Sequence, residues 1–428
     1  MNSLKTFNLN KQIAALLLAT LSMALVSCGD ADQGTADSAN NQTLESTEQI
    51  SVAVDMLSEE QANAVREIIQ LYLQELQADF ADAGQHLQTF DTQIDDFLAS
   101  TDETSLATAR DGWQLAYNAY ETTQLHRYFA AEVFSDDLLL QLGDLDYRLN
   151  QWPILPGYVD AVDNYPDSGL VFDTSVALVP DTLREIHGQF DLAEAALGFH
   201  VIEFLLWGEN LTAGGPRPAS DFVAATSLNA EQIEFGFTLE QLPNNRRREL
   251  LDLLAELINT DYQNAARLWS QGMGEYALSV DTLVAEDLLS DLLQAINAML
   301  TEELLVRSLY PLLNGEYEES LHSRFSNSTE DSVIAQLATL ERLLMDTSST
   351  EGMRLDSLFA DLSDDFAELF YQNFDASKEC LVLLYSDVAA PESPEEMMAA
   401  EFEVVECINL LTNMIDHFNR LQQSLGRA

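Results

Sequence analysis

The chain contains the apolar stretch GFHVIEFLLWG at residues 198–208, in which a histidine and a carboxylate stand three residues apart. On an α-helix, residues with this spacing lie on one face, so His200 and Glu203 can meet a single cation or proton. Imidazole and carboxylate together suit transition metals, and iron-binding helix bundles use these two residue types at the same spacing. The spacing equally fits a histidine–glutamate hydrogen bond inside a core. This stretch therefore leaves both a metal site and a structural pair open.

Apolar residues recur at helical spacing along most of the chain, as in the stripe of Val65, Ile68, Ile69, Leu73 and Leu76. Strand-like alternation is absent over any useful length, which predicts an all-α fold. In the second half, the same periodicity predicts helices at 248–268, 281–304, 331–344, 355–370 and 394–425.

A glycine- and proline-rich segment around Gly214, Gly215, Pro216 and Pro218 interrupts the helical pattern. We therefore expect two helical bundles packed together, joined by long irregular connections, with the candidate site where the bundles meet. Phe222, Phe235 and Phe237 are expected to hold the linker in place. The predicted parts are a leader at 1–28, a flexible tether at 29–49, an N-terminal bundle at 50–211, a linker at 212–243 and a C-terminal bundle at 244–428.

The N-terminus has the pattern of a secretory signal. Lys5 and Lys11 precede an apolar run at 13–26 that is too short to span a bilayer as a mature helix. The ending Ser27-Cys28-Gly29 resembles a bacterial lipobox, which implies that Cys28 carries the lipid. The resemblance also implies a location in the cell envelope, anchored to the outer membrane and facing the periplasm. The polar residues 29–49 cannot bury enough surface to fold and serve as the tether.

The whole chain is strongly acidic, with a formal net charge of −53. Such a surface repels phosphate, which argues against nucleic acid and against direct contact with lipid headgroups. Besides Cys28 the cysteines are Cys380 and Cys407, which in an oxidising envelope either form a disulfide or stay free. No Cys-x-x-Cys pair is present, which argues against a thiolate zinc site.

The pattern Gly198-x-His200-x-x-Glu203, followed by Leu206-Trp207-Gly208, resembles the signature of the imelysin-like family of bacterial envelope proteins. The segment from Trp113 to Glu121 is similar to the family's first conserved helix. The resemblance implies that Glu121 is a third metal ligand beside His200 and Glu203. Read without the resemblance, Glu121 could equally be a surface residue.

Two further segments resemble the family and imply supporting residues around the metal. Arg148 belongs to an Arg-x-x-x-Trp-Pro segment, where it could clamp a carboxylate or form an ordinary ion pair. Arg324 and Ser326 belong to a loop that is similar to one facing the His-x-x-Glu helix. Asn327 stands in that loop where an aspartate is usual, which puts an intact metal site in doubt.

Imelysin-like proteins are linked to iron acquisition and are also classed as metallopeptidases. The resemblance implies a lipoprotein that binds an iron or zinc ion, or an iron chelate, and passes it to an envelope transport partner. A peptidase would need three protein ligands and a general base, and the sequence identifies no base. A structural surface lipoprotein whose site has decayed is the third possibility.

Overall fold

All regular secondary structure in the described part of the chain is helical. The computed structural model describes residues 57–209, 215–345, 355, 358–359, 366–386 and 394–425. Apart from one isolated bridge between Val162 and Tyr165, these ranges contain no β-structure. The predicted all-α fold is therefore confirmed. The predicted leader, tether and Cys28 lie outside the described residues. Within the described ranges, no helix is both long and apolar enough to cross a bilayer.

The first four described helices are α2 (Glu59–Ala99), α3 (Glu103–Thr122), α4 (Gln124–Val133) and α5 (Asp136–Asn150). Of these, α3 and α5 contribute side chains to the candidate site. Helix α2 buries side chains three and four residues apart along its length, so a single stripe packs against α3 and α10. Capping boxes at Ser58 and Asp102 satisfy the first free N–H groups of α2 and α3.

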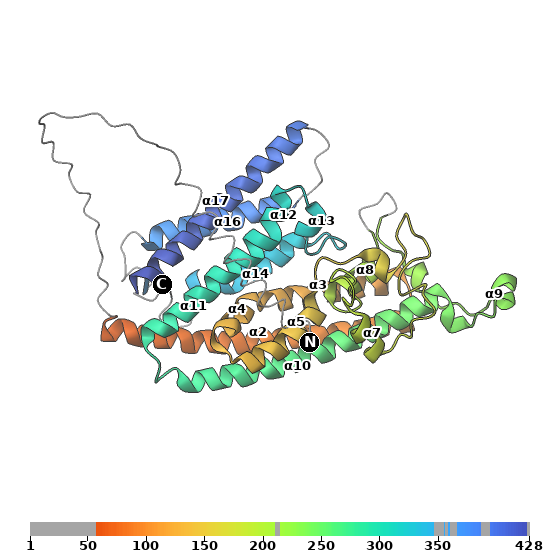
Figure 1. Ribbon diagram of the computed structural model, residues 1–428, viewed down its shortest axis with the longest axis horizontal. Helices are drawn as coiled ribbons and strands as arrows, with labels where there is room; N and C mark the ends of the chain where they lie inside the picture. Colours follow the sequence, from red (N-terminus) through yellow and green to blue (C-terminus); the bar gives the residue numbers. More distant parts are fainter. Residues whose placement is uncertain are drawn as a thin grey trace, which may run out of the picture. The chain divides into compact units, whose positions relative to one another are not determined.

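Irregular chain then connects short helices: α6 (Pro156–Val159), α7 (Pro180–Ile186), α8 (Phe199–Trp207), the 3₁₀ turn η1 (Ala219–Phe222), α9 (Ala230–Glu234) and the 3₁₀ turn η2 (Leu239–Gln241). The prediction that three phenylalanines hold the linker was wrong for two of them. Phe222 is fully buried, but Phe235 and Phe237 are exposed. Both residues follow α9, which buries none of its residues and projects from the other helices (Figure 1), so it offers these side chains no apolar surface.

The second half contains α10 (Pro243–Ser279), α11 (Ala285–Met299), the π-helix η3 (Leu300–Leu309), α12 (Tyr310–Leu313), α13 (Tyr317–Ser320), α14 (Thr329–Met345), α16 (Phe366–Ser386) and α17 (Pro394–Ser424). Helix α10 is longer at both ends than predicted, and the helix predicted at 281–304 changes to π geometry at Leu300. Part of the helix predicted at 355–370 lies outside the described residues, and α16 extends well beyond its predicted end.

Helix α10 packs along α2 and α5, although its sequence follows the predicted linker. Buried apolar side chains from Val65 to Leu425 form one continuous core. Guanidinium groups at the start of α10 also hold the irregular connection: Arg246 donates to the carbonyls of Leu170 and Val171. The described helices of both predicted bundles thus share one apolar interior.

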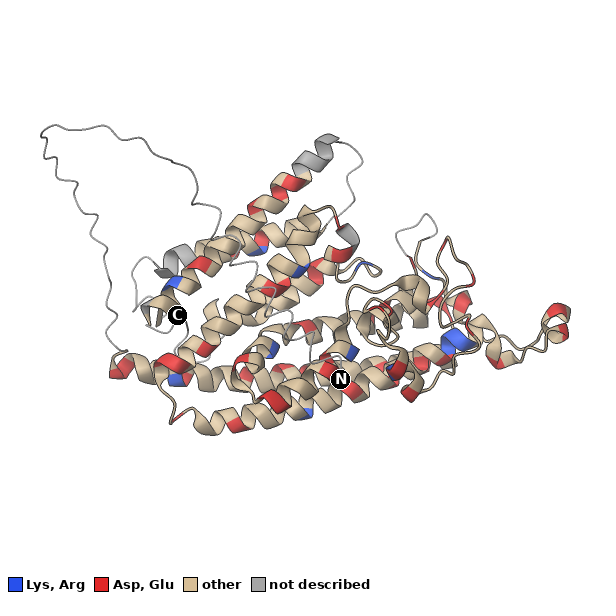
Figure 2. Ribbon diagram, viewed as in Figure 1, with Lys and Arg blue, Asp and Glu red and all other residues tan. Residues whose placement is uncertain are grey.

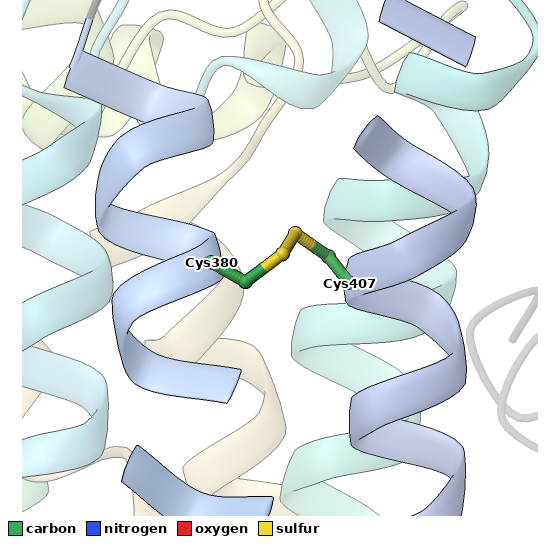
Figure 3. Close-up of a disulfide and its surroundings, with 2 residues drawn as sticks. All are labelled: Cys380 and Cys407. Atoms are coloured by element: carbon green, nitrogen blue, oxygen red, sulfur yellow. A yellow bond between two sulfur atoms is a disulfide. The ribbon is translucent and has the colours of Figure 1, made fainter. Parts of the chain in front are cut away.

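Cys380 of α16 and Cys407 of α17 form a disulfide, with 5.6 Å between their Cα atoms (Figure 3). Of the two outcomes that the sequence left open, the structure contains the paired one. The bond joins residues 27 apart in sequence. In the unfolded chain the bond keeps these two residues together, which lowers the conformational entropy of the unfolded state.

Replacing both cysteines, Cys380→Ser with Cys407→Ser, should lower the free energy of unfolding by about 3–4 kcal/mol, the loop-entropy estimate for this separation. Urea unfolding of the oxidised parent and the double variant measures the change. Adding reductant should bring the parent close to the variant and leave the variant unchanged. A difference below about 1 kcal/mol would show that the bond constrains little.

Candidate functional site around His200 and Glu203

Helix α8 starts at Phe199 because the backbone conformation of Gly198 is not helical. Gly198 has φ of 101°, a conformation that side chains with a Cβ rarely adopt. A Cβ at this position would lie 2.7 Å from the carbonyl oxygens of Arg148 and Leu149. The apolar run 192–206 is therefore not one helix. The close approach of Gly198 to the end of α5 brings His200, in the first turn of α8, next to that helix end.

Side chains from α3 hold both ends of this short helix. The indole N–H of Trp113 donates to the Phe199 carbonyl at 3.0 Å, and Arg110 donates to the Leu206 carbonyl at 2.7 Å. All nine residues of α8 are buried, including His200 and Glu203. A histidine and a glutamate without exposure must find their partners within the protein.

His200 and Glu203 are each other's partner. Nδ1 of His200 lies 3.2 Å from Oε2 of Glu203. The other ring nitrogen, Nε2, lies 3.0 Å from Oδ1 of Asn150 and 3.3 Å from the hydroxyl of Tyr117. The ring also packs against the Trp152 indole, with 4.7 Å between ring centroids. These contacts hold the orientation of the imidazole.

The loop before α14 provides the second set of contacts to Glu203. The backbone N–H and the hydroxyl of Ser326 donate to Oε1 at 2.8 and 2.7 Å. The next residue, Asn327, has φ of 57°, a left-handed conformation that asparagine tolerates better than most residues. Its side chain is exposed. In this structure Asn327 therefore contributes a backbone turn that presents Ser326 to Glu203.

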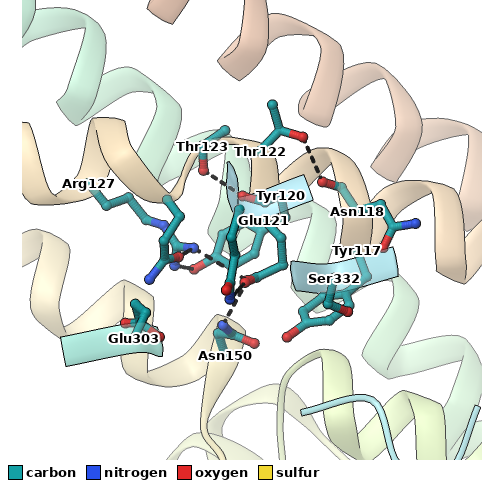
Figure 4. A network of polar contacts seen from close by, with 12 residues as sticks. Tyr117, Asn118, Tyr120, Glu121, Thr122, Thr123, Arg127, Asn150, Glu303 and Ser332 are labelled. Carbon is teal, nitrogen blue, oxygen red and sulfur yellow. Dashed lines mark hydrogen bonds and ion pairs between the residues drawn. The ribbon is translucent and has the colours of Figure 1, made fainter. Parts of the chain in front are cut away.

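Asn150, the last residue of α5, connects His200 to Glu121. Its Nδ2 donates to Oε1 of Glu121 at 3.2 Å (Figure 4), and Gln336 of α14 donates to Oε2 at 2.5 Å. Arg127 is paired with the same carboxylate at 3.4 Å. Because Asn150 donates through Nδ2, its Oδ1 faces His200. A continuous chain of hydrogen bonds therefore runs from Ser326 through Glu203, His200 and Asn150 to Glu121.

Protonation of the buried pair follows from its surroundings. Burial, opposed by the Ser326 hydrogen bonds, raises the pKa of Glu203 to about 8. Burial and the nearby charges of Arg307 and Arg324 lower the pKa of His200 to about 3. At neutral pH the imidazole is uncharged and donates from Nε2 to Asn150, since Oδ1 can only accept. The protonated carboxyl of Glu203 then donates a hydrogen bond from Oε2 to Nδ1.

Comparison with known proteins places this arrangement in a family. The family model described as Imelysin matches residues 76–397, more than half of the chain. The chain belongs to the imelysin family.

Two solved structures have the same fold. One is named an iron-regulated protein A precursor, from Parabacteroides distasonis ATCC 8503, with 15% identity and a TM-score of 0.54 over 85% of this chain and 96% of that one. The other is an imelysin-like protein from Psychrobacter arcticum 273-4, with 13% identity and a TM-score of 0.54 over 87% of this chain and 98% of that one. No curated protein sequence matches the chain.

The residues that the imelysin resemblance implied are only partly brought together. Ser326 contacts Glu203 directly, and Arg324 is close enough to lower its pKa. Arg148 instead pairs with Asp144 and lies 4.0 Å from Asp261, so it forms ion pairs away from the three predicted ligands. Glu121 is buried rather than on the surface, but it reaches His200 only through Asn150.

The donor set does not fit a catalytic zinc. Among the described residues, no three histidine, cysteine, aspartate or glutamate side chains are grouped closely enough to hold a metal ion. A catalytic zinc requires three protein ligands and an open position. The pair alone does suit two-point coordination, because ligand atoms at 2.0–2.2 Å from one tetrahedral ion stand roughly 3.3 Å apart, close to the 3.2 Å between Nδ1 and Oε2.

Sequence reasoning missed Asn150 and Arg307. Asn150 follows Asp146 by four residues on α5, and Asp146 is half-buried, with a pKa raised to about 6 by the desolvation of its carboxyl. Two polar side chains one turn apart were the available signal. Arg307 had no comparable signal, because it lies far from His200 in the sequence and no motif connects the two.

Glu203→Gln should keep the fold and remove a pH dependence. The folded protein holds the Glu203 proton up to pH of about 8, whereas an unfolded chain releases it near 4.5. The parent therefore loses stability as pH rises through this window, and a glutamine amide, which donates to Nδ1 without ionising, does not. As the pH rises, the unfolding free energy of the parent should fall relative to that of the variant by up to about 1.4 kcal/mol per pH unit.

Urea unfolding between pH 4.5 and 8.5 measures this difference. Glu302→Gln, an exposed position on η3, is the matched control and should show no such trend. Parallel pH profiles for the parent and Glu203→Gln would mean that Glu203 is ionised in the folded protein at neutral pH.

Proposed function

We propose that this imelysin-family protein binds a metal carried in an anionic complex, with iron the metal we favour. His200 Nδ1 and Glu203 Oε2 would supply two donors, and the chelator would supply the rest. The observation that carries the proposal is this buried pair, whose atoms lie 3.2 Å apart. Binding would replace the shared proton with the metal, so Glu203 would gain its charge only when a cation balances it.

The arginines around the pair favour a chelate over a bare ion. Arg307 and Arg324 are near enough to lower the pKa of His200, and the same charges would repel a free cation. Guanidinium groups bind carboxylates well. The Arg307 side chain is 37% exposed and donates from Nη1 to the buried carboxylate of Glu303, so a chelator would share this guanidinium with Glu303. In such a complex, the carboxylates of the chelator would bind the arginines. The metal would bind His200 and Glu203.

Peptidase activity is less well supported. Its zinc would need a third protein ligand, and the Glu121 carboxylate is engaged by Asn150 and Gln336. A general base is also missing, since Glu203 holds its proton at neutral pH. The structural alternative has a specific observation in its favour: every polar atom of the pair has a partner without any ligand.

We further propose that the protein works in the cell envelope, held by lipid on Cys28 at the outer membrane and facing the periplasm, where it would deliver its cargo to a transport partner. The N-terminal sequence supports the anchor. Iron as the metal is supported by the fold shared with a protein named for regulation by iron. An iron complex released into the periplasm would be a suitable cargo at that location.

Calorimetric titration of protein lacking residues 1–28 tests the proposal, with Fe(III)–citrate, citrate alone and Zn(II) as probes. The parent should bind Fe(III)–citrate more tightly than Zn(II). Glu203→Gln should weaken Fe(III)–citrate by about tenfold or more while leaving citrate unchanged, since it removes a metal donor only. Arg324→Gln should weaken both, since it removes a contact to the chelator.

Glu302→Gln is the control and should bind like the parent. Zn(II) binding tighter than the chelate, together with peptide hydrolysis lost in Glu203→Gln, would favour the peptidase. Equal, weak binding of every probe by parent and variants would leave the pair as a structural element. Thermal unfolding of each variant shows whether lost binding reflects lost fold.

A further inference from the structure

The arm formed by residues 223–242 exposes apolar side chains that the fold does not use. Ile233 is 64% exposed, Phe235 72% and Phe237 39%. All three lie at or just after the end of α9, at the far end of the arm (Figure 1). Single exposed apolar residues are common on protein surfaces, but three within five residues on a projecting element form a patch.

Local hydrogen bonds give the tip of the arm a defined shape. Asn229 and Gln232 exchange side chain to backbone bonds at the start of α9, at 2.8 and 2.9 Å. At its end, Gly236 has φ of 75° and the N–H of Phe237 donates to the Gln232 carbonyl at 2.9 Å, which is a Schellman-type ending. These bonds give a defined backbone to the five-residue helix and to the turn after it, which carry Ile233, Phe235 and Phe237.

The base of the arm is fixed as well. Asn245, at the start of α10, accepts from the Ala225 N–H at 2.9 Å and donates to the carbonyls of Ala225 and Leu239 at 3.0 and 2.7 Å. One side chain thus ties the outgoing and returning segments together. Asn244 adds a bond to the Val223 carbonyl at 3.0 Å. A preformed arm loses little conformational entropy when it binds.

The charge of the arm indicates what it binds. Residues 223–242 contain three carboxylates, Glu231, Glu234 and Glu240, and neither lysine nor arginine. Figure 2 shows acidic residues around α9 and no basic residue beside it. A phospholipid surface fits poorly, because interfacial elements use basic residues to meet phosphate headgroups. A second copy fits poorly too, since it would bring the same net charge of −53.

We propose that the arm is a docking element for another protein, whose apolar groove is rimmed by lysine or arginine. Phe235 and Phe237 would fill the groove, because aromatic side chains in desolvated pockets carry most of the binding energy at interfaces. Glu231, Glu234 and Glu240 would face the basic rim and speed association. This inference is independent of metal binding at His200.

Photocrosslinking in cells that make the full-length protein tests the proposal. A benzoylphenylalanine at position 235 should give one discrete adduct with another protein. The same residue at position 278, where Leu278 is 85% exposed on α10, should not. Mass spectrometry identifies the adduct, and the purified partner is then titrated with the parent and with Phe235→Ser/Phe237→Ser.

The double variant should bind this partner at least about tenfold more weakly at an unchanged melting temperature, because neither residue belongs to the core. Glu231→Gln/Glu234→Gln/Glu240→Gln should weaken binding at low salt, and high salt should remove the difference. An adduct with a second copy, an adduct with lipid, no discrete adduct, or a partner that binds the double variant equally well would each overturn the proposal.

Discussion

The hydrogen bond between Glu203 and His200 is the contact on which the rest of the site depends. Both side chains are buried, so neither can ionise alone without a large cost. A neutral imidazole and a protonated carboxyl avoid that cost by sharing one proton. Ser326 donates to Glu203 on one side of the pair, and Asn150 accepts from His200 on the other. Helices α3, α5, α8 and α14 meet around the resulting chain of bonds.

Much of this could be predicted from the sequence. Helical periodicity gave the fold class, because apolar stripes in an all-α protein are read directly from spacing. Gly198 stands two residues before His200, and the backbone of α5 that approaches it explains why only glycine fits there. The family resemblance implied that the loop of Ser326 faces the His-x-x-Glu helix, and in the structure Ser326 donates to Glu203.

Other features depend on tertiary geometry that spacing does not encode. The family resemblance made Glu121 a direct ligand, but the structure inserts Asn150 between it and His200. The sequence around Arg148 is compatible both with an arginine that clamps a carboxylate and with the ion pair that the structure contains. Phe235 and Phe237 have the apolar side chains of core residues, but they follow α9, which packs against no part of the core. In each case the residue type indicated what kind of contact the side chain could make, but the sequence did not show which residues would lie beside it.

The proton between Glu203 and His200 can be observed directly. Infrared difference spectra of the parent minus Glu203→Gln isolate the carbonyl stretch of this one carboxyl from the other buried acids. The account predicts a protonated carboxyl signal at pH 7 that disappears as the pH rises through about 8, the raised pKa of Glu203. A carboxylate signal at pH 7 would contradict it, because His200 would then have to carry the charge.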